Sequence, residues 1–448
     1  MNPDVVVIGG GFAGVAAAVA LTRAGKRVTL VEARGRMGGR AATLVDRATG
    51  EPVDNGQHVL FGCYRETLAL LEALGQRDRV FVQPALHVPF IGSDGARRDL
   101  RCADLPAPLN LAAGLLRWSA LDMRDRLRAA RLFLSLKRGS KPGDDETVTA
   151  WLVRMGQTRR LRGWLWEPLA IAALNESPNI ASARMFAPVL RELFGGHRRD
   201  ASLVLPLLPL GELYAEPAAK YLESRGGEVH LGRPARVSPG AGGFTVRAGD
   251  RRWTAPAVIA AVPWHHLASL FDGAIPPALD AIAAAAAAMT PVPIVTVNIW
   301  FDRPVLEADD VPFRGLVGRT AQWVFDRRII DGERSMHVSV ITSAAAGLVE
   351  RDDAAIIGIV TADLRAALPA AADAAVLRAT VIREKQATFS VRPGAPDRPV
   401  ERTPLPGFFL AGDWLKTGLP GTIEGAVRSG NRAAHQLLCG PSSFTTTK

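Results

Sequence analysis

Cysteine and tyrosine are scarce in this sequence of 448 residues, which contains three of each. Cys63, Cys102 and Cys439 lie far apart and form no CxxC pair. This excludes a disulfide scaffold and a cysteine-based metal centre, and it fits a reducing compartment. The eight histidines include no HExxH pattern, so we expect no metal site.

Long apolar runs and basic tracts are also missing. The longest uncharged stretch, residues 281–301, begins as mostly alanine and contains Pro291 and Pro293. It therefore predicts the end of a helix followed by a strand, not a membrane span. Lys and Arg number 54 against 44 Asp and Glu, a net charge of +10, but no compact basic tract is interleaved with aromatic residues. We expect no nucleic-acid partner and, because no secretion signal is evident, a cytoplasmic protein.

The N-terminus predicts a βαβ unit. Residues 4–8 (DVVVI) have the composition of a strand buried on both faces, residues 16–24 predict a helix, and residues 28–31 predict a second strand. Between the first strand and the helix, residues 9–14 read GGGFAG and match the dinucleotide fingerprint GxGxxG. This context predicts a dinucleotide whose pyrophosphate lies at the helix N-terminus.

Each glycine of the fingerprint has an expected role. Gly9 permits the tight turn, Gly11 lets the backbone approach the pyrophosphate, and Gly14 lets the helix pack against the strand. Glu32 ends the second strand and is expected to accept a hydrogen bond from a ribose 2′-OH. Its charge would repel a 2′-phosphate, which disfavours NADP.

The run GGR at residues 38–40 follows closely. Its two glycines allow close backbone approach to a ligand, and Arg40 supplies a fixed cation for a pyrophosphate. Plain NAD dehydrogenases do not need such a run. The GGR therefore favours FAD over NAD.

Sheet-forming segments occur at the start, in the middle and at the end of the chain, whereas helices dominate residues 64–203, with one long helical stretch over 109–137. This pattern predicts an α/β fold in which a discontinuous Rossmann-like FAD-binding domain carries an inserted α+β substrate-binding domain. The FAD-binding domain is expected to comprise residues 1–62, 205–289 and 399–440, and the substrate-binding domain residues 63–204 and 290–398.

With these motifs the chain resembles the amine oxidase and phytoene desaturase superfamily of flavoproteins. Near the C-terminus, Gly412-Asp413 and the run TIEGA at residues 422–426 match that superfamily, as do DNGQH at residues 54–58 and Val237. In the superfamily the Gly-Asp pair meets the FAD pyrophosphate and ribityl chain, and TxEGA opens a helix that faces the isoalloxazine. The resemblance implies an FAD site made of Gly9, Gly11, Phe12, Ala13, Gly14, Glu32, Ala33, Arg34, Gly38, Gly39, Arg40, Gly56, Gln57, His58, Val237, Gly412, Asp413, Thr422, Ile423 and Ala426.

The inserted segments resemble the hydroxysqualene dehydroxylase family of squalene and hopanoid biosynthesis. The matching runs are AALNES at residues 172–177, ASA at 181–183, PIV at 293–295, WF at 300–301 and QWVFD at 322–326. The resemblance implies a C30 isoprenoid substrate, hydroxysqualene, whose allylic hydroxyl is removed reductively by hydride transfer from reduced flavin to give squalene.

The implied reaction needs an apolar tunnel, a proton donor for the hydroxyl and the exclusion of water. Glu176, Gln322 and Asp326 lie in the family-like segments and are the candidate catalytic residues. No second GxGxxG has a strand before it and a helix after it. Electrons are therefore expected from a separate reductase, free reduced flavin or a reduced nicotinamide, and the sequence leaves these three open.

Residues 117–138 are rich in arginine and interleaved with leucine. Two interpretations stay open for this segment. It could contact an anionic membrane peripherally, on the cytoplasmic face of the inner membrane, and feed the tunnel. The alternative is a solvated helix of the substrate-binding domain.

Three other functions share parts of this pattern. A carotenoid- or phytoene-type desaturase has the same fold and cofactor but acts oxidatively. A true amine oxidase is less favoured, because no lysine lies between Lys220 and Lys385 and only three tyrosines are available for an aromatic cage. A prenyl-binding protein like the Rab GDP-dissociation inhibitors would lack a full flavin site, which the intact C-terminal motifs oppose.

Overall fold

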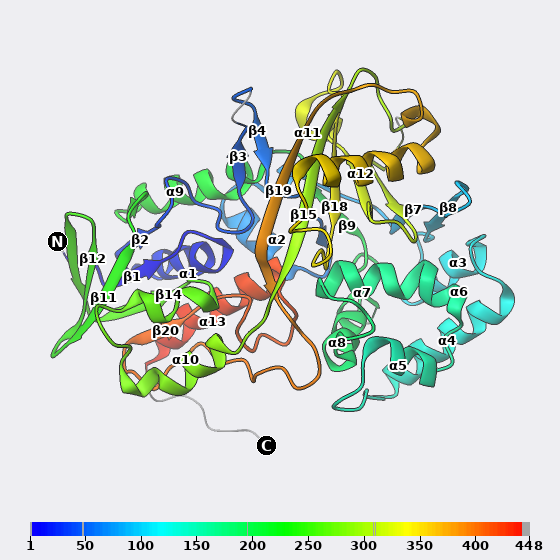
Figure 1. Cartoon of the computed structure of the whole chain (residues 1–448). Helices are drawn as coiled ribbons and strands as arrows, with labels where there is room; N and C mark the ends of the chain where they lie inside the picture. Colours follow the sequence, from blue (N-terminus) through cyan, green and yellow to red (C-terminus); the bar gives the residue numbers. More distant parts are fainter. Residues whose placement is uncertain (1, 47–48, 195, 308, 310, 441–448) are drawn as a thin grey trace.

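The computed structural model describes residues 2–46, 49–194, 196–307, 309 and 311–440. Within these residues the chain forms two parts that long strands connect (Figure 1). The part at the left of Figure 1 contains helices from both ends of the chain and from residues 216–287, and the part at the right contains the helices of residues 109–194. None of the helices in the described residues combines the length and apolar composition needed to cross a bilayer.

A parallel five-stranded sheet forms the centre of the first part. Its strands in spatial order are β10 (Glu228–His230), β2 (Val28–Val31), β1 (Val5–Ile8), β14 (Ala257–Ala260) and β20 (Phe408–Leu410). Strands β1, β2 and β14 are buried along their whole length, as expected of central parallel strands. The sheet thus joins segments from the start, the middle and the end of the chain, all inside the ranges predicted for the FAD-binding domain.

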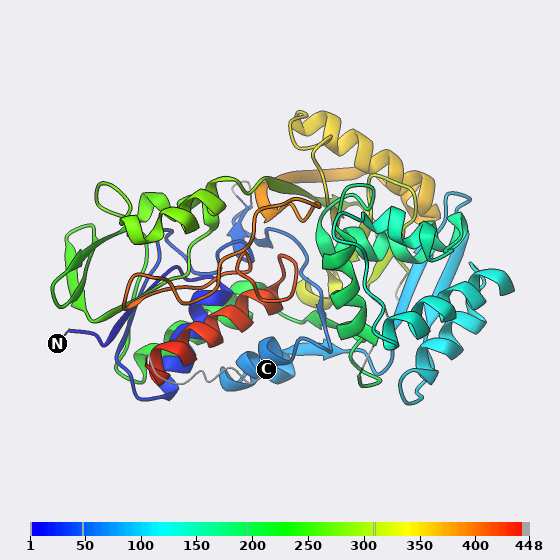
Figure 2. The same ribbon diagram turned by 90° about the horizontal axis from the view of Figure 1, so that it is seen from below.

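Two helices pack against each other beside this sheet, α1 (Phe12–Arg23) and α13 (Ile423–Cys439) (Figure 2). Their contact depends on glycine. A Cβ added to Gly430 of α13 would lie 2.2 Å from the Ala13 carbonyl oxygen of α1. On another side of α1, a Cβ added to Gly14 would lie 1.9 Å from the Gly9 carbonyl oxygen, in the turn that follows β1. The close packing predicted for Gly14 is confirmed.

Smaller elements complete this part. Helices α9 (Glu216–Glu223) and α10 (Asp280–Ala287) belong to it, and α2 (Arg65–Ala73) borders α13. The remaining strands form three small antiparallel sheets, namely β11 (Ala235–Gly240) with β12 (Gly243–Ala248) and β13 (Arg251–Ala255), β3 (Thr43–Val45) with β4 (Pro52–Asp54), and β5 (Leu60–Phe61) with β9 (Leu203–Pro206) and β6 (Val80–Val82).

A seven-stranded sheet organises the second part. Its order is β19 (Val376–Phe389), β15 (Pro291–Phe301), β18 (His337–Thr342), β17 (Trp323–Asp326), β16 (Phe313–Leu316), β7 (His87–Ile91) and β8 (Arg97–Arg101). Helix α12 (Asp353–Ala367) covers one face, where Val295, Val297 and Ile299 join its core. Strands β15 and β19 are the longest and extend toward the first part (Figure 1).

Helices form the rest of the second part. These are α3 (Leu109–Arg117), α4 (Met123–Lys137), α5 (Val148–Arg154), α6 (Arg159–Leu161), α7 (Glu167–Leu174), α8 (Ala183–Phe194) and the short α11 (Arg328–Asp331). The helical stretch predicted over residues 109–137 is divided into α3 and α4. The chain turns after Trp118, and Asp122 starts α4 through a capping box with Asp125.

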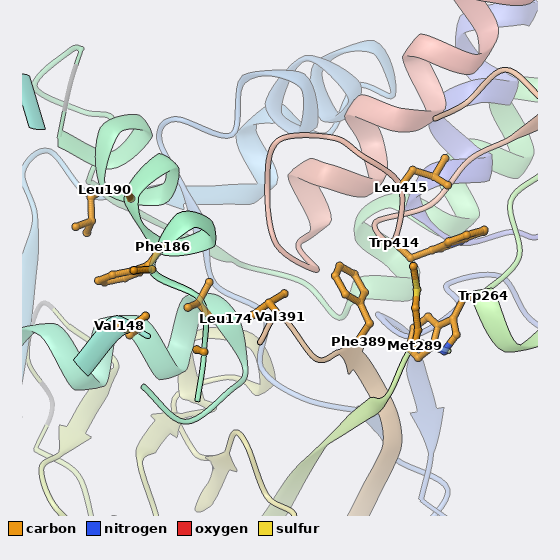
Figure 3. Close-up of a cluster of buried hydrophobic side chains, with 14 of the residues drawn as sticks. Val148, Leu174, Phe186, Leu190, Trp264, Met289, Phe389, Val391, Trp414 and Leu415 are labelled. Carbon is orange, nitrogen blue, oxygen red and sulfur yellow. The ribbon is translucent and has the colours of Figure 1, made fainter. Parts of the chain in front are cut away.

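One hydrophobic core crosses between the parts. Figure 3 shows Trp264, Met289, Trp414 and Leu415 of the first part on one side of Phe389 and Val391, and Phe186 and Leu190 of α8 on the other. Phe389 is the last residue of β19, and residues 389–391 link the two groups. The parts are therefore packed together and do not merely share a linker.

Replacing Gly430 by alanine tests the packing of α1 on α13. The added methyl group meets a backbone carbonyl that cannot rotate away, so we expect the free energy of unfolding to fall by about 2 kcal/mol, within the range of overpacking changes. Gly358→Ala in α12 is the matched control, because nothing lies within 4 Å of its added Cβ. That change removes backbone entropy only and should stabilise by roughly 0.5–1 kcal/mol. Equal unfolding transitions of the two variants in a denaturant titration would contradict this packing.

Candidate active site

The glycine-rich turn between β1 and α1 forms one wall of a large cavity. Gly9 has φ +110°, and an added Cβ would lie 2.4 Å from the Ala261 carbonyl oxygen, so the tight turn requires glycine. Gly11 is the N-cap of α1 and faces only Gly39, whose Cα is 3.7 Å from an added Cβ. The N–H groups that begin α1 therefore face open space between two glycines, which suits a pyrophosphate.

Glu32 is fixed at the end of β2. Its Oε2 accepts a hydrogen bond from the Gly10 amide at 2.7 Å, and its Oε1 accepts one from the Arg34 amide at 2.8 Å. The side chain is buried and lines the cavity. Each carboxylate oxygen retains a second lone pair, so the group is oriented by the backbone and available to a ribose hydroxyl.

The GGR run is joined to the C-terminal motif by an ion pair. The Arg40 guanidinium pairs with the Asp413 carboxylate and also donates to the Ala387 carbonyl of β19 at 2.8 Å. Tyr214 stacks on Phe12 and donates to the Gly38 and Ala41 carbonyls at 2.8 and 2.9 Å. Arg40 and Asp413, which are more than 370 positions apart in the sequence, thus meet at the cavity wall. Sequence reasoning did not identify Tyr214 as a residue that supports the GGR run.

The DNGQH segment is anchored by a buried arginine. Arg327 donates to the Gln57 side chain at 2.7 Å and lies 3.4 Å from the Asp54 carboxylate. Gly56 and His58 line the cavity. Burial lowers the pKa of His58 below its usual value, with Asp54 opposing this effect, so His58 is neutral near pH 7.

Helix α13 begins at the cavity wall. Thr422 is its N-cap and accepts from the Gly425 amide at 3.0 Å. Glu424 points the other way, toward α2, and accepts from the Glu66 and Thr67 amides. Burial raises the pKa of Glu424. The glutamate of TIEGA therefore fixes the position of α13, while Thr422, Ile423 and Ala426 face the cavity.

These segments line a single cavity of about 940 Å³. Of the FAD residues predicted from the sequence, Gly14 and Val237 are not in its lining and the others are. Gly14 packs against the Gly9 carbonyl instead. Near Val237 the lining is formed by Pro234, Ala235 and Arg236, so the predicted adenine contact through Val237 backbone groups stays a prediction.

The same cavity continues into the second part, where its walls become apolar. Strands β7, β16 and β17 and helices α3, α4, α7 and α8 contribute side chains there. The residues are Val88, Phe90, Leu111, Leu115, Phe133, Leu165, Leu169, Leu193, Phe194, Phe313, Trp323 and Phe325. A dinucleotide cradle thus opens directly into a hydrophobic chamber.

The three candidate catalytic residues do not line this cavity. Glu176 accepts from the Ser390 hydroxyl at 2.6 Å, and Asp326 is paired with Arg328. Gln322 donates to the Ser343 carbonyl at 3.1 Å and accepts from the Ser343 amide at 2.9 Å. Because their polar atoms are held by the protein, this placement gives them supporting positions, and their catalytic role stays a prediction.

Among the polar residues of the lining, sequence reasoning did not single out Ser269, Ser343, Glu384, Gln386 or Thr388. No sequence motif marks them. Among the described residues no group of three or more His, Cys, Asp and Glu could hold a metal ion. The residues present fit FAD, because the glycine turn, Glu32 and Arg40 match the pyrophosphate, ribose and phosphate charge of a dinucleotide.

Replacing Glu32 by glutamine tests this fit. The neutral amide loses the charge-assisted hydrogen bonds that the carboxylate makes to the two amides and to the ribose, so the Kd for FAD should rise about 10- to 100-fold. Fluorescence titration of the apoprotein with FAD measures it. Glu228→Gln in the neighbouring strand β10 is the control, since Glu228 is exposed and pairs with His230. An unchanged Kd in the Glu32 variant would exclude this ribose site.

Comparison with known proteins agrees with this geometry. Residues 12–438 match the family of flavin-containing amine oxidoreductases. The hydroxysqualene dehydroxylase of Sinorhizobium fredii is 30% identical over 98% of this chain and 99% of its own, and that of Rhodopseudomonas palustris is 30% identical with the same coverage. The zeta-carotene desaturase of Synechocystis is 27% identical over 99% of this chain and 98% of its own.

Solved structures support the fold. An oxidoreductase from Methanosarcina mazei superposes with a TM-score of 0.74 at 18% identity, covering 96% of this chain and 100% of its own. A putrescine oxidase double mutant gives 0.71 at 18% identity, covering 98% and 99%. The present chain is an oxidoreductase, and its cofactor is FAD. The chain belongs to the family of flavin-containing amine oxidoreductases and, within it, to the hydroxysqualene dehydroxylase group.

Proposed function

We propose that the protein removes the allylic hydroxyl of hydroxysqualene reductively and releases squalene. The main support for this proposal is that the FAD cradle opens directly into a chamber walled by leucine, phenylalanine and tryptophan. A long hydrocarbon is stabilised in such surroundings by its apolar area alone. The relatives named hydroxysqualene dehydroxylase, which align over nearly the full chain, support the choice of substrate.

The chamber has a chemical consequence as well as a binding role. Loss of the allylic hydroxyl generates positive charge on carbon, which water would capture. The apolar walls exclude water from that carbon. Reduced FAD, when bound, supplies the two electrons and the hydrogen that the carbon gains. The source of those electrons in the cell is a reductase, free reduced flavin or a nicotinamide.

A carotenoid-type desaturase is the second candidate. The Synechocystis zeta-carotene desaturase and the 15-cis-phytoene desaturase of Narcissus pseudonarcissus align over 99% and 97% of this chain, each at 27% identity. Both candidate functions need FAD beside an apolar chamber, so the chamber walls do not distinguish them. The two functions differ in the direction of electron flow, because the dehydroxylase oxidises reduced FAD and the desaturase reduces oxidised FAD.

The basic segment predicted from the sequence carries an apolar surface that we propose contacts an anionic membrane. On α3 and α4 the side chains of Leu109, Leu116, Met123, Leu127 and Leu134 are exposed, between 52% and 61%. The opposite sides of the same helices contribute Leu111, Leu115 and Phe133 to the chamber. Exposed arginines flank the leucines, namely Arg117, Arg124, Arg131 and Arg138. A lipid-soluble substrate would pass from the bilayer across these helices into the chamber.

Single-turnover product analysis tests the reaction. Anaerobic holoenzyme with photoreduced FAD and hydroxysqualene should yield squalene and re-oxidised flavin in equal amounts, measured by mass spectrometry and absorbance. Oxidised holoenzyme mixed with phytoene should remain oxidised. Reduction of the flavin by phytoene, together with no squalene from hydroxysqualene, would favour the desaturase.

Vesicle co-sedimentation tests the membrane surface. Binding to phosphatidylglycerol vesicles should exceed binding to phosphatidylcholine vesicles and decrease with salt, because each basic residue near an anionic surface contributes about 1 kcal/mol. The double variant Leu116→Glu/Leu127→Glu should lose most of this binding. Leu377→Glu, at a leucine that is 69% exposed on β19, is the control and should bind like the wild type. Equal binding of all three proteins would refute the surface.

A further inference from the structure

We propose that Glu384 binds the hydroxyl group of the substrate and supplies the proton with which it leaves. This inference rests on the proposed function and names the residue that acts on the reacting oxygen. Glu384 lies on β19 and lines the cavity where the FAD cradle meets the apolar chamber.

The pairing of β19 fixes the direction of this side chain. Glu384 pairs with Ile294 of β15, and directly paired residues of an antiparallel sheet point to the same face. Ile294 also lines the cavity. The flanking residues point to the opposite face, where Arg383 pairs with Asp353 and Lys385 with Glu350, both near α12. Glu384 is therefore turned toward the cavity by strand geometry.

Two contacts place Glu384 beside the cofactor cradle. Three residues further along β19, the Ala387 carbonyl accepts from Arg40, which pairs with Asp413. Two residues earlier, Ile382 pairs with Thr296, whose Oγ1 lies 3.2 Å from the position of a Cβ on Gly56. Glu384 lies between these two points along the strand. Its carboxyl group is thus near the border that a substrate must reach to react with the flavin.

The other acidic groups of the cavity are already engaged. Glu32 is held by the Gly10 and Arg34 amides, and Asp413 by Arg40. Glu384 is the carboxylic acid that remains, and among the described residues it has no hydrogen-bond or ion-pair partner.

Two of the three histidines that line the cavity, His58 and His265, are poor alternatives as the acid. Burial is the largest effect on His265 and, with the charges of His266 and Arg40, lowers its pKa to about 4. His58 has a pKa lowered by burial. Both rings are therefore neutral near pH 7, and a neutral imidazole is a poor proton donor.

Two further polar side chains accompany Glu384. Gln386 lies two residues further along β19 and also lines the cavity, and Ser343 follows β18, the neighbour of β15 on its other side. Gln322 holds both backbone groups of Ser343, and the Asn175 side chain accepts from the Ala344 amide at 2.7 Å. The family-like residues Asn175 and Gln322 thus hold Ser343 and Ala344 in position beside the apolar wall.

The proposed step balances. Glu384 enters the step as the carboxylic acid. Its proton moves to the substrate oxygen, the carbon–oxygen bond breaks, and the bonding electron pair leaves with water. The carbon is then reduced by the two electrons and one hydrogen from reduced FAD, which is oxidised. Glu384 remains as a carboxylate, close to the developing positive charge, and regains a proton from solvent.

The test uses holoenzyme and two substitutions. Glu384→Gln keeps the shape and the hydrogen bond but has no acidic proton, so squalene formation in single turnover should fall by about 100-fold or more. Glu384→Leu removes the hydrogen bond as well. Glu350→Gln is the matched control, since Glu350 is an exposed carboxylate on the other side of β19. It should react like the wild type.

A binding comparison gives a readout without turnover. Oxidised holoenzyme is titrated with hydroxysqualene and with squalene while tryptophan fluorescence is followed, because Trp323 lines the cavity. The wild type should bind the alcohol about tenfold more tightly than the hydrocarbon, and Glu384→Leu should lose this preference. Full squalene formation in both Glu384 variants, or an unchanged alcohol preference in Glu384→Leu, would overturn the proposal. If the wild type forms no squalene, the proposed function and the proton transfer fall together, and the binding comparison still decides whether Glu384 holds the hydroxyl.

Discussion

At three glycines the main chain lies directly against a backbone carbonyl group, and the FAD-binding part of the molecule depends on these contacts. Gly9 turns against the Ala261 carbonyl, Gly14 against the Gly9 carbonyl, and Gly430 against the Ala13 carbonyl. Dense packing of main chain on main chain leaves no room for a side chain at these positions. In return the N-termini of α1 and α13 both reach the cavity wall, one beside the phosphate-binding turn and the other beside Thr422. The electrostatic character of the FAD site follows from this packing.

Strands β15 and β19 form part of the hydrophobic core with one face and part of the cavity wall with the other. One face contributes Val295 and Val297 to the core under α12, which gives the sheet its rigidity. The other face contributes Ile294 and Glu384 to the cavity, and the Ala387 carbonyl to Arg40. A single paired unit therefore supports the cofactor cradle, the apolar chamber and the proposed acid. Sites carried on strands are held more precisely than sites on loops.

The cofactor half of the candidate site could be predicted from the sequence, because its motifs are local. A glycine turn, Glu32 and the GGR run depend on neighbours within about thirty residues, and each of them contributes to the cavity lining. The substrate half could not be predicted in the same way, because it depends on strand register. Nothing in the run Glu384-Lys385-Gln386 reveals which side chains face the cavity until β19 is paired with β15. Glu176 and Gln322 were chosen by resemblance, and they hold neighbouring residues such as Ser343 in position.

The order of the central strands also bears on biosynthesis. The β14 strand pairs with β1 on one side and with β20 on the other, and Asp413 follows β20. A ribosome therefore releases the last piece of the FAD cradle only after the whole helical insertion has been made. The nascent chain must fold its hydrophobic chamber while the cradle is incomplete, exposing apolar surface to chaperones for most of its synthesis.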